Sequence, residues 1–240
     1  MAGGAYAALS GLRTRIDQLD RLAADIANVN TAGYKSERVA TVEARRPDFS
    51  AVLQSAVDVA AAPGLLDFRN GSIQTTGRDL DFALEGRGFF VVDTAAGPRY
   101  TRNGQFSRRA DGVLTTAGGD VVAGDSGPIR LADEGALSIE ADGTVRSGQT
   151  VAGKLRLVDF DDYNTLTRED GGRFHAGAAT PRAAADVRVR AGSLEQSNVQ
   201  LVERMAQLTE VGRSFEALQR GISVLMNDVD GRAISELGRR

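Results

Sequence analysis

The sequence has no cysteine, no tryptophan and a single histidine, and its aromatic content is only 5%. The absence of cysteine excludes disulfides, thiolate metal sites and cysteine nucleophiles. The single histidine, His175, cannot build a metal site of several histidines, so we expect no such site. With so few aromatic residues, the chain offers little for stacking single-stranded nucleic acid.

The sequence also lacks a large excess of charge of either sign, and it lacks long apolar runs. A net charge of -3 gives no basic footprint, so we expect no nucleic acid partner. No apolar run approaches the ~20 residues of a membrane helix, which argues against direct membrane insertion. Charges such as Arg13, Arg15 and Asp17 interrupt residues 1–26, so this segment does not read as a secretory signal peptide. We therefore expect any export to proceed without a cleaved peptide.

Both ends of the chain carry apolar residues at alternating spacings of three and four, a pattern typical of helices that pack on other helices. We expect one helix over residues 2–27 and a second from a capping box at Ser197 and Gln200 to about residue 228. The pattern predicts partner helices within the chain, in other subunits, or both. Its members are Ala5, Leu9, Leu12, Ile16, Leu19, Ala23 and Ile26, then Leu201, Met205, Leu208, Phe215, Leu218, Ile222, Leu225 and Val229.

Glycines and amides punctuate these helices. Asn28, Asn30 and Gly33 are expected to end the first one, because asparagine and glycine tolerate left-handed geometry. Gly212 and Gly221 lie inside the second, where each costs about 1 kcal/mol relative to alanine. They indicate either a close helix approach or tolerated surface positions.

Between the helices, turn signals recur at short spacing, which favours an antiparallel β domain. The predicted hairpin turns are Asn70-Gly71, Asn103-Gly104, Asp111-Gly112 and Asp142-Gly143. The predicted strands are residues 88–92, 99–101, 113–116, 137–140, 155–160 and 187–190. The predicted core residues are Phe82, Leu84, Phe89, Phe90, Tyr100, Phe106, Leu114 and Ile139.

These patterns predict an α+β fold in which N- and C-terminal helices form a coiled-coil-like layer beside a central antiparallel β-rich domain. The expected segments are a helix and its end (1–35), a connecting arm (36–75), the β-rich domain (76–186) and a C-terminal strand and helix (187–240). Within the arm, residues 52–62 are compatible with a short helix or a mobile arm.

Two local patterns resemble catalytic or metal-binding motifs and fail on inspection. Ser126 lies in Gly-Asp-Ser-Gly, but His175 follows it in the chain, whereas trypsin-like proteases place histidine before serine. The acidic run that begins at Asp159 has Asn164 at the sixth position, where a calcium loop requires glycine. A secreted serine hydrolase that uses Ser126 therefore remains a remote alternative, and we expect no enzyme.

Four separated stretches resemble the bacterial flagellar rod and hook protein family. These are residues 27–35 (ANVNTAGYK), 77–90 (GRDLDFALEGRGFF), 100–106 with 111–114 (YTRNGQF, DGVL), and 192–199 (GSLEQSNV) with Val202-Glu203 and 213–216 (RSFE). The compact length most resembles the proximal-rod type, and the distal-rod or another hook-basal-body protein is the alternative.

The resemblance implies a structural subunit of an axial tube that spans the periplasm, transmits torque and carries an export channel. It also implies that the protein catalyses no reaction and has no cofactor and no metal site. Its implied partners are other copies of itself, neighbouring rod proteins and the flagellar export apparatus. It also implies that subunits contact one another through the terminal helices and the motifs beside them. The implied interface residues are Leu9, Leu12, Ile16, Leu19, Ile26, Asn28, Asn30, Gly33, Tyr34, Ser197, Asn198, Leu201, Met205, Leu208, Phe215 and Ile222.

Overall fold

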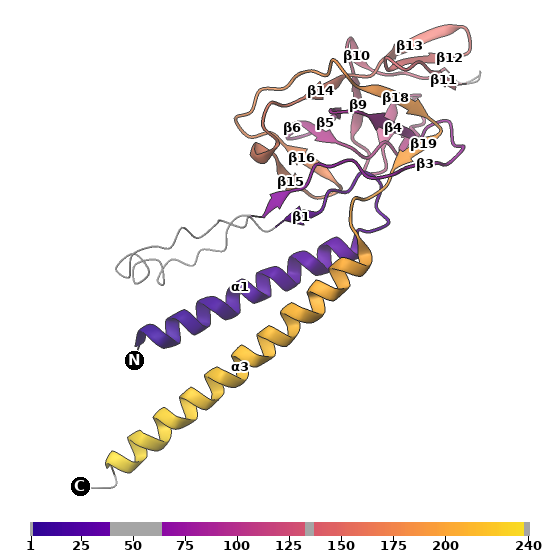
Figure 1. Cartoon of the computed structure of the whole chain (residues 1–240). Coiled ribbons are helices and arrows are strands. Elements are labelled where there is room, and N and C mark those ends of the chain that lie inside the picture. The colour runs from indigo at the N-terminus through magenta and orange to yellow at the C-terminus, as the bar shows by residue number, and fades with distance from the viewer. Residues whose placement is uncertain (1, 39–63, 133–136, 238–240) are drawn as a thin grey trace. The chain divides into compact units, whose positions relative to one another are not determined.

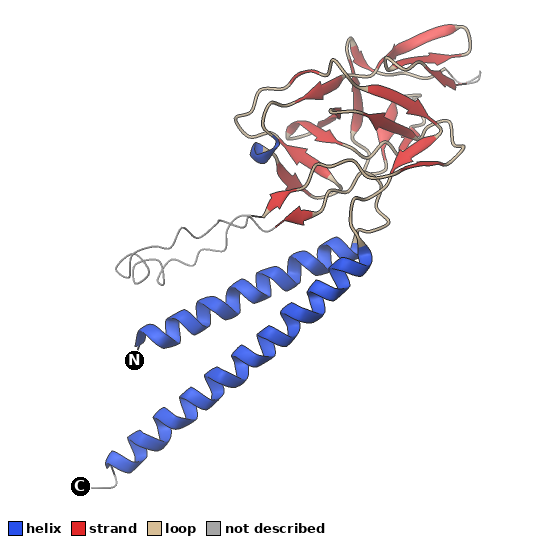
Figure 2. Ribbon diagram, viewed as in Figure 1, coloured by secondary structure: helices blue, strands red, loops and turns tan. Residues whose placement is uncertain are grey.

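The computed structural model describes residues 2–38, 64–132 and 137–237, and the segment expected at 52–62 lies outside them. The chain divides into two compact units. The helical unit comprises Met1–Ala27, Glu37–Leu65 and Gln200–Arg240, and the β unit comprises Asn28–Ser36 and Leu66–Val199. Figure 1 labels the elements, and Figure 2 separates helices from strands by colour.

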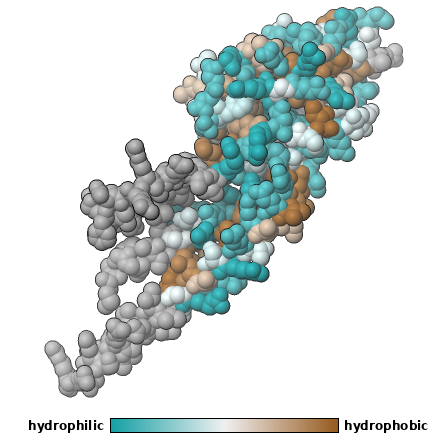
Figure 3. Space-filling view, viewed as in Figure 1, coloured by the Kyte–Doolittle hydropathy of each residue, from teal (hydrophilic) through white to brown (hydrophobic). Residues whose placement is uncertain are grey.

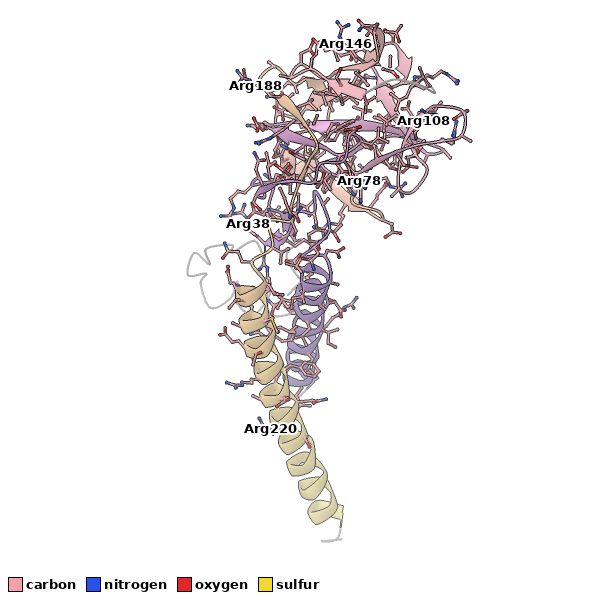
Figure 4. All side chains as sticks on the ribbon, turned by 90° about the vertical axis from the view of Figure 1, so that its right-hand side faces the viewer. Arg38, Arg78, Arg108, Arg146, Arg188 and Arg220 are labelled. Atoms are coloured by element: carbon pink, nitrogen blue, oxygen red, sulfur yellow. The ribbon has the colours of Figure 1, made fainter. Side chains whose placement is uncertain are left out.

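The helical unit contains α1 (Ala2–Ala27) and α3 (Leu201–Leu237), which lie side by side in Figures 1 and 4. The bounds of α1 confirm the helix predicted over residues 2–27. The helices run antiparallel: Asp25 pairs with Arg204 near the end of α1 and the start of α3, and Gly11 lies against Leu218 further along. A Cβ at Gly11 would lie 3.3 Å from Cδ2 of Leu218, so the glycine permits this close approach.

The predicted coiled-coil-like layer is wrong. The part of the chain that the structure describes has two α-helices, which form one pair, beside a much larger antiparallel β-rich unit. Among residues 11–27 of α1, whose side chains the structure describes, the buried residues are Leu22 and Asp25, and neither belongs to the predicted stripe. Ile16 in that stripe is 46% exposed, and Met205 on α3 is 54% exposed. On α1 the facing side, which holds Gly11 and Asp25, is rotated away from the predicted stripe, whereas on α3 Leu218, a member of the predicted stripe, faces α1.

The start of α3 also differs from the prediction. The helix begins at Leu201, and Ser197 Oγ accepts a hydrogen bond from the Val199 amide instead of capping the helix. Gly212 and Gly221 face open space, since a Cβ at either position would meet nothing within 4 Å. Within this chain, neither glycine serves a close helix approach.

The β unit is built from short antiparallel strands, which confirms the β-rich part of the predicted fold. Its main sheet has the order β15-β16-β6-β5-β9-β8-β7, with β10 beside β9, β14 beside β5 and β17 beside β14. Smaller ladders are β11-β12-β13, β4-β18 and β3-β19, and β1 (Glu37–Arg38) pairs with β2 (Leu65–Leu66).

The remaining bounds are β3 (Ile73–Thr75), β4 (Phe82–Glu85), β5 (Phe89–Thr94), β6 (Gly97–Thr101), β7 (Phe106–Arg108), β8 (Leu114–Thr116), β9 (Val121–Gly124), β10 (Gly127–Pro128), β11 (Leu137–Ile139), β12 (Thr144–Ser147), β13 (Thr150–Lys154), β14 (Leu157–Asp159), β15 (Thr167–Glu169), β16 (Arg173–His175), β17 (Arg182–Ala183), β18 (Arg188–Ala191) and β19 (Ser193–Glu195). A single 3-10 turn, η1, covers Tyr163–Thr165.

Strand β5 lies between two hydrophobic clusters. Because side chains alternate along a strand, Phe90 and Val92 enter one cluster while Phe89 and Val91 enter the other. Seven of the eight predicted core residues are buried, and Ile139 is partly buried against the first cluster. The predicted core is therefore confirmed. Its buried members are Phe82, Leu84, Phe89, Phe90, Tyr100, Phe106 and Leu114.

Two of the four predicted hairpin turns are confirmed. Gly112 and Gly143 have positive φ and connect β7 to β8 and β11 to β12. Asn70-Gly71 and Asn103-Gly104 connect strands that do not pair with each other. These two glycines permit close backbone approach: an added Cβ would lie 1.9 Å from the Gln196 carbonyl oxygen at Gly71, and 1.7 Å from that of Phe82 at Gly104.

Candidate assembly site

The segment after α1, residues 28–36, belongs to the β unit and is fixed there by glycine geometry. Thr31 donates its amide hydrogen bond to the Asn28 carbonyl, and the Asn28 side chain accepts from the Thr31 hydroxyl. Gly33 then adopts φ of 68°, and its amide donates to the Glu195 carbonyl at 2.7 Å. A Cβ at Gly33 would lie 2.4 Å from the Arg102 carbonyl carbon, so only glycine fits.

A buried ionic cluster lies directly beyond this turn. Lys35 Nζ donates to Glu195 Oε1 at 2.6 Å, and both side chains are fully buried. Arg102 donates to Glu195 Oε2 at 3.3 Å and to the Gly86 carbonyl at 2.8 Å. The amide of Gly71 also donates to Glu195 Oε1, at 3.0 Å. One carboxylate therefore joins four distant stretches of the chain.

The electrostatics of this cluster depend on Glu195. Burial lowers the pKa of Lys35, and the opposing charge of Glu195 counteracts that effect. Without the carboxylate, two cations would remain in a dry interior. The cluster was not predicted, because a lysine, an arginine and a glutamate far apart in sequence read as solvated residues. The signal that was present is that all three lie within the stretches that resemble one family.

Asn198 bridges three of the four places where the chain crosses the boundary of the β unit. Its Oδ1 accepts from the Ser36 amide at 2.7 Å, and its Nδ2 donates to the Asp67 carbonyl at 2.7 Å. The Asp67 amide in turn donates to the Ser36 carbonyl at 2.8 Å. The residue predicted as a subunit contact is therefore engaged within its own chain.

Tyr34 is also held within the β unit. The guanidinium of Arg168 on β15 lies 4.4 Å from the centre of the Tyr34 ring and donates to the tyrosine hydroxyl at 3.0 Å. Arg168 further donates to the Lys35 carbonyl. Gly33 and Tyr34 are buried, Asn28 and Ser197 are half-buried, and Asn30 is exposed.

The predicted interface residues on the helices fall into two groups. The side chain of Leu9 lies outside the described part. Leu12, Leu19 and Ile26 on α1, and Leu208, Phe215 and Ile222 on α3, are half-buried. The exposed group is Ile16, Leu201 and Met205. Val202, which was not predicted, is the most exposed large apolar side chain of the described residues, at 82%. Figure 3 shows hydrophobic residues at the surface of the helical unit.

The rejected catalytic residues lie at the surface of the β unit, whereas Asp159, the first residue of the rejected calcium-loop pattern, is buried. Ser126 is exposed in the turn between β9 and β10, and His175 is exposed on β16. Asp159 accepts from the Tyr163 hydroxyl at 2.5 Å and from Arg182 at 3.0 Å. Among the described residues, no group of three or more histidine, cysteine or acidic side chains is placed to hold a metal ion. None of the described helices has the length and apolar character to cross a membrane.

Two family models match the chain. Residues 83–147 match the flagellar hook protein FlgE/F/G D1 domain, and residues 190–227 match the C-terminal region of the flagellar basal body rod FlgEFG proteins. The second match includes Glu195 and Asn198, and the first includes Arg102.

Curated relatives align over nearly the full length. The chain is 33% identical to the flagellar basal-body rod protein FlgF of Caulobacter vibrioides, with 92% of each chain covered. It is 32% identical to FlgF of Salmonella typhimurium, with 95% of each covered. The flagellar basal-body rod protein FlgG of Bacillus subtilis is 30% identical, with 88% of this chain and 90% of the relative covered.

Proposed function

Because the chain belongs to the family of flagellar basal-body rod proteins and is a structural subunit of that rod, we propose that it is the proximal-rod type. This assignment is supported by the relatives named FlgF, which are 32–33% identical over 90% or more of this chain. The FlgG relatives are 30% and 26% identical. The distal rod is therefore the less favoured position. Labelling the subunit in isolated basal bodies and imaging its place along the axis tests this assignment.

The family places the protein in the flagellar basal body, in assembly with other rod components. We propose further that it contacts copies of itself, spans part of the periplasm and leaves the cytoplasm through the flagellar export apparatus without a cleaved peptide. In this proposal its role is mechanical, transmitting torque around a channel, and it has no enzymatic activity. Labelling of Ser126 by a serine-directed covalent probe would contradict the last point.

We propose that the helical unit supplies the contacts between subunits. The supporting observation is that Ile16, Leu201, Val202 and Met205 expose large apolar side chains in the single chain, while the β unit buries its core. Exposed apolar groups gain free energy when another subunit covers them, at about 25 cal/mol per Å². The proposed functional segments remain 1–35 and 187–240 at the ends and 76–186 in the middle, joined by the 36–75 arm.

Leu12→Asp tests this proposal. Leu12 is half-buried on the apolar stripe of α1, so a carboxylate there should block incorporation into the rod while the β unit stays folded. Arg13→Asp is the matched control, because Arg13 is exposed on the same helix. Incorporation is measured in basal bodies isolated from cells that lack the native subunit. Normal incorporation of the Leu12 variant would contradict the role assigned to this stripe.

A further inference from the structure

The helical unit contains a buried ion pair between its two helices. Asp25 on α1 is 1% exposed, and its Oδ2 lies 3.1 Å from Nε of Arg204 on α3. The Glu37 amide donates to Asp25 Oδ1 at 3.3 Å, and Arg204 donates to the Glu37 carbonyl at 3.1 Å. Both members of the pair are therefore also bound by the backbone of Glu37.

This pair and one steric contact define how α1 is aligned on α3. Moving fourteen residues back along α1, from Asp25 to Gly11, corresponds to moving fourteen residues forward along α3, from Arg204 to Leu218. Fourteen residues are close to four helical turns, so both contacts lie on the same facing sides. In this register Ala2 lies opposite about residue 227 of α3. The last turns of α3, residues 228–237, therefore have no α1 residue opposite them.

The repeating apolar stripe of α3 does not by itself select this register. On α3 the half-buried apolar side chains recur every three or four residues: Leu208, Val211, Phe215, Leu218 and Ile222. A slip of α1 by seven residues towards the C-terminus of α3 would again place apolar groups opposite α1. It would also move Asp25 from Arg204 to Val211. A buried carboxylate without its cation is strongly unfavourable.

We propose that the Asp25–Arg204 pair is a specificity-determining contact that selects this register of α1 on α3 against registers displaced by seven residues. A buried polar or ionic contact that fixes helix register is the best-attested use of such groups. The register also sets how much of α3 extends past α1. Its importance for rod assembly rests on the proposed function, whereas the register itself does not.

The absence of cysteine makes the register directly measurable. Leu218→Cys combined with Gly11→Cys reports the observed register through disulfide formation in the full-length chain. Leu218→Cys combined with Gln18→Cys reports the register displaced by seven residues. The ratio of the two cross-linking rates is compared in the native background, in Asp25→Leu and in Arg204→Leu. Arg13→Leu, at an exposed position of α1, is the matched control.

We expect Asp25→Leu to lower this ratio by at least about tenfold, since removal of the buried charge removes the penalty on the slipped register. The charge exchange Asp25→Arg with Arg204→Asp should recover most of the ratio, and the control should leave it unchanged. An unchanged ratio in both leucine variants overturns the proposal. Loss of both cross-links with a folded β unit also overturns it, because the pair would then hold the helices together without selecting a register. Neither result depends on rod incorporation, which the Leu12 variant tests separately.

Discussion

Glu195→Gln is the sharpest test of how the β unit is held together. The substitution keeps the size of the side chain and removes the carboxylate that pairs with both Lys35 and Arg102. The side chains of all three residues are at most 1% exposed, so water cannot replace the carboxylate. Removing one partner of such a buried pair costs about 3–5 kcal/mol. The amide nitrogen would add a donor where three donors already converge.

Glu85→Gln is the matched control. Glu85 pairs with Arg190 at 3.3 Å, but the side chains are 45% and 55% exposed. An exposed pair of this kind contributes less than about 1 kcal/mol. Urea unfolding of the full-length protein, followed by a signal of the β unit, should show a much lower midpoint for the Glu195 variant and a nearly native one for the control.

A double variant separates stranded charge from lost packing. Once Glu195 is glutamine, Lys35→Met should cost little more or restore stability, because it removes one uncompensated cation. The coupling free energy between the two substitutions should reach at least about 1.5 kcal/mol. Equal losses for the Glu195 and Glu85 variants, or simple additivity with Lys35→Met, would refute the reasoning.

Two glycines and one carboxylate give further tests. Gly33→Ala should destabilise the protein by more than about 1 kcal/mol, because the φ of Gly33 is 68° and an added Cβ would meet the Arg102 backbone. Gly212→Ala should stabilise α3 by about 1 kcal/mol, because an added Cβ at this helical position would meet nothing within 4 Å. Thermal unfolding measures both variants, and effects of the same sign would contradict this reasoning. Hydrogen bonds from Lys154 and from the amide and hydroxyl of Thr144 hold the pKa of Asp142 at about 2, below its ordinary value of 3.8. Its small stabilising effect should persist above pH about 4 and disappear as the pH falls through about 2, and Lys154→Met should raise this pKa in an NMR titration.

Local signals predicted the elements of this fold better than their pairing. The apolar pattern of the N-terminal segment gave the bounds of α1, and alternating large side chains gave most of the core. A turn dipeptide specifies the local backbone conformation, but it does not specify whether the two strands that flank the turn pair with each other. Gly112 therefore closes a hairpin, while Gly104, with a similar sequence signal, makes room for the Phe82 carbonyl.

The helix faces show a similar limit. A three-and-four spacing of apolar residues defines a stripe, but the side of α1 that packs on α3 carries Leu22, Asp25 and Gly11. Asp25 and Gly11 do not contribute to an apolar pattern, so the pattern could not identify this side. The buried ionic cluster was missed for a related reason: a charge is expected in water unless its partner is known, and Lys35 and Glu195 are 160 residues apart. Only the tertiary structure brings that partner into place.

The bridge made by Asn198 has a mechanical consequence. Ser36, Asp67 and Asn198 stand where the backbone crosses the boundary of the β unit, and one side chain connects all three. Tension on any one of these three backbone segments passes to the other two through the hydrogen bonds of Asn198 and the adjacent Lys35–Glu195 pair. In an assembled rod we expect this set of contacts to share force among the connecting segments before the force reaches the sheet. The strands would then carry less shear than the hydrogen bonds around Asn198.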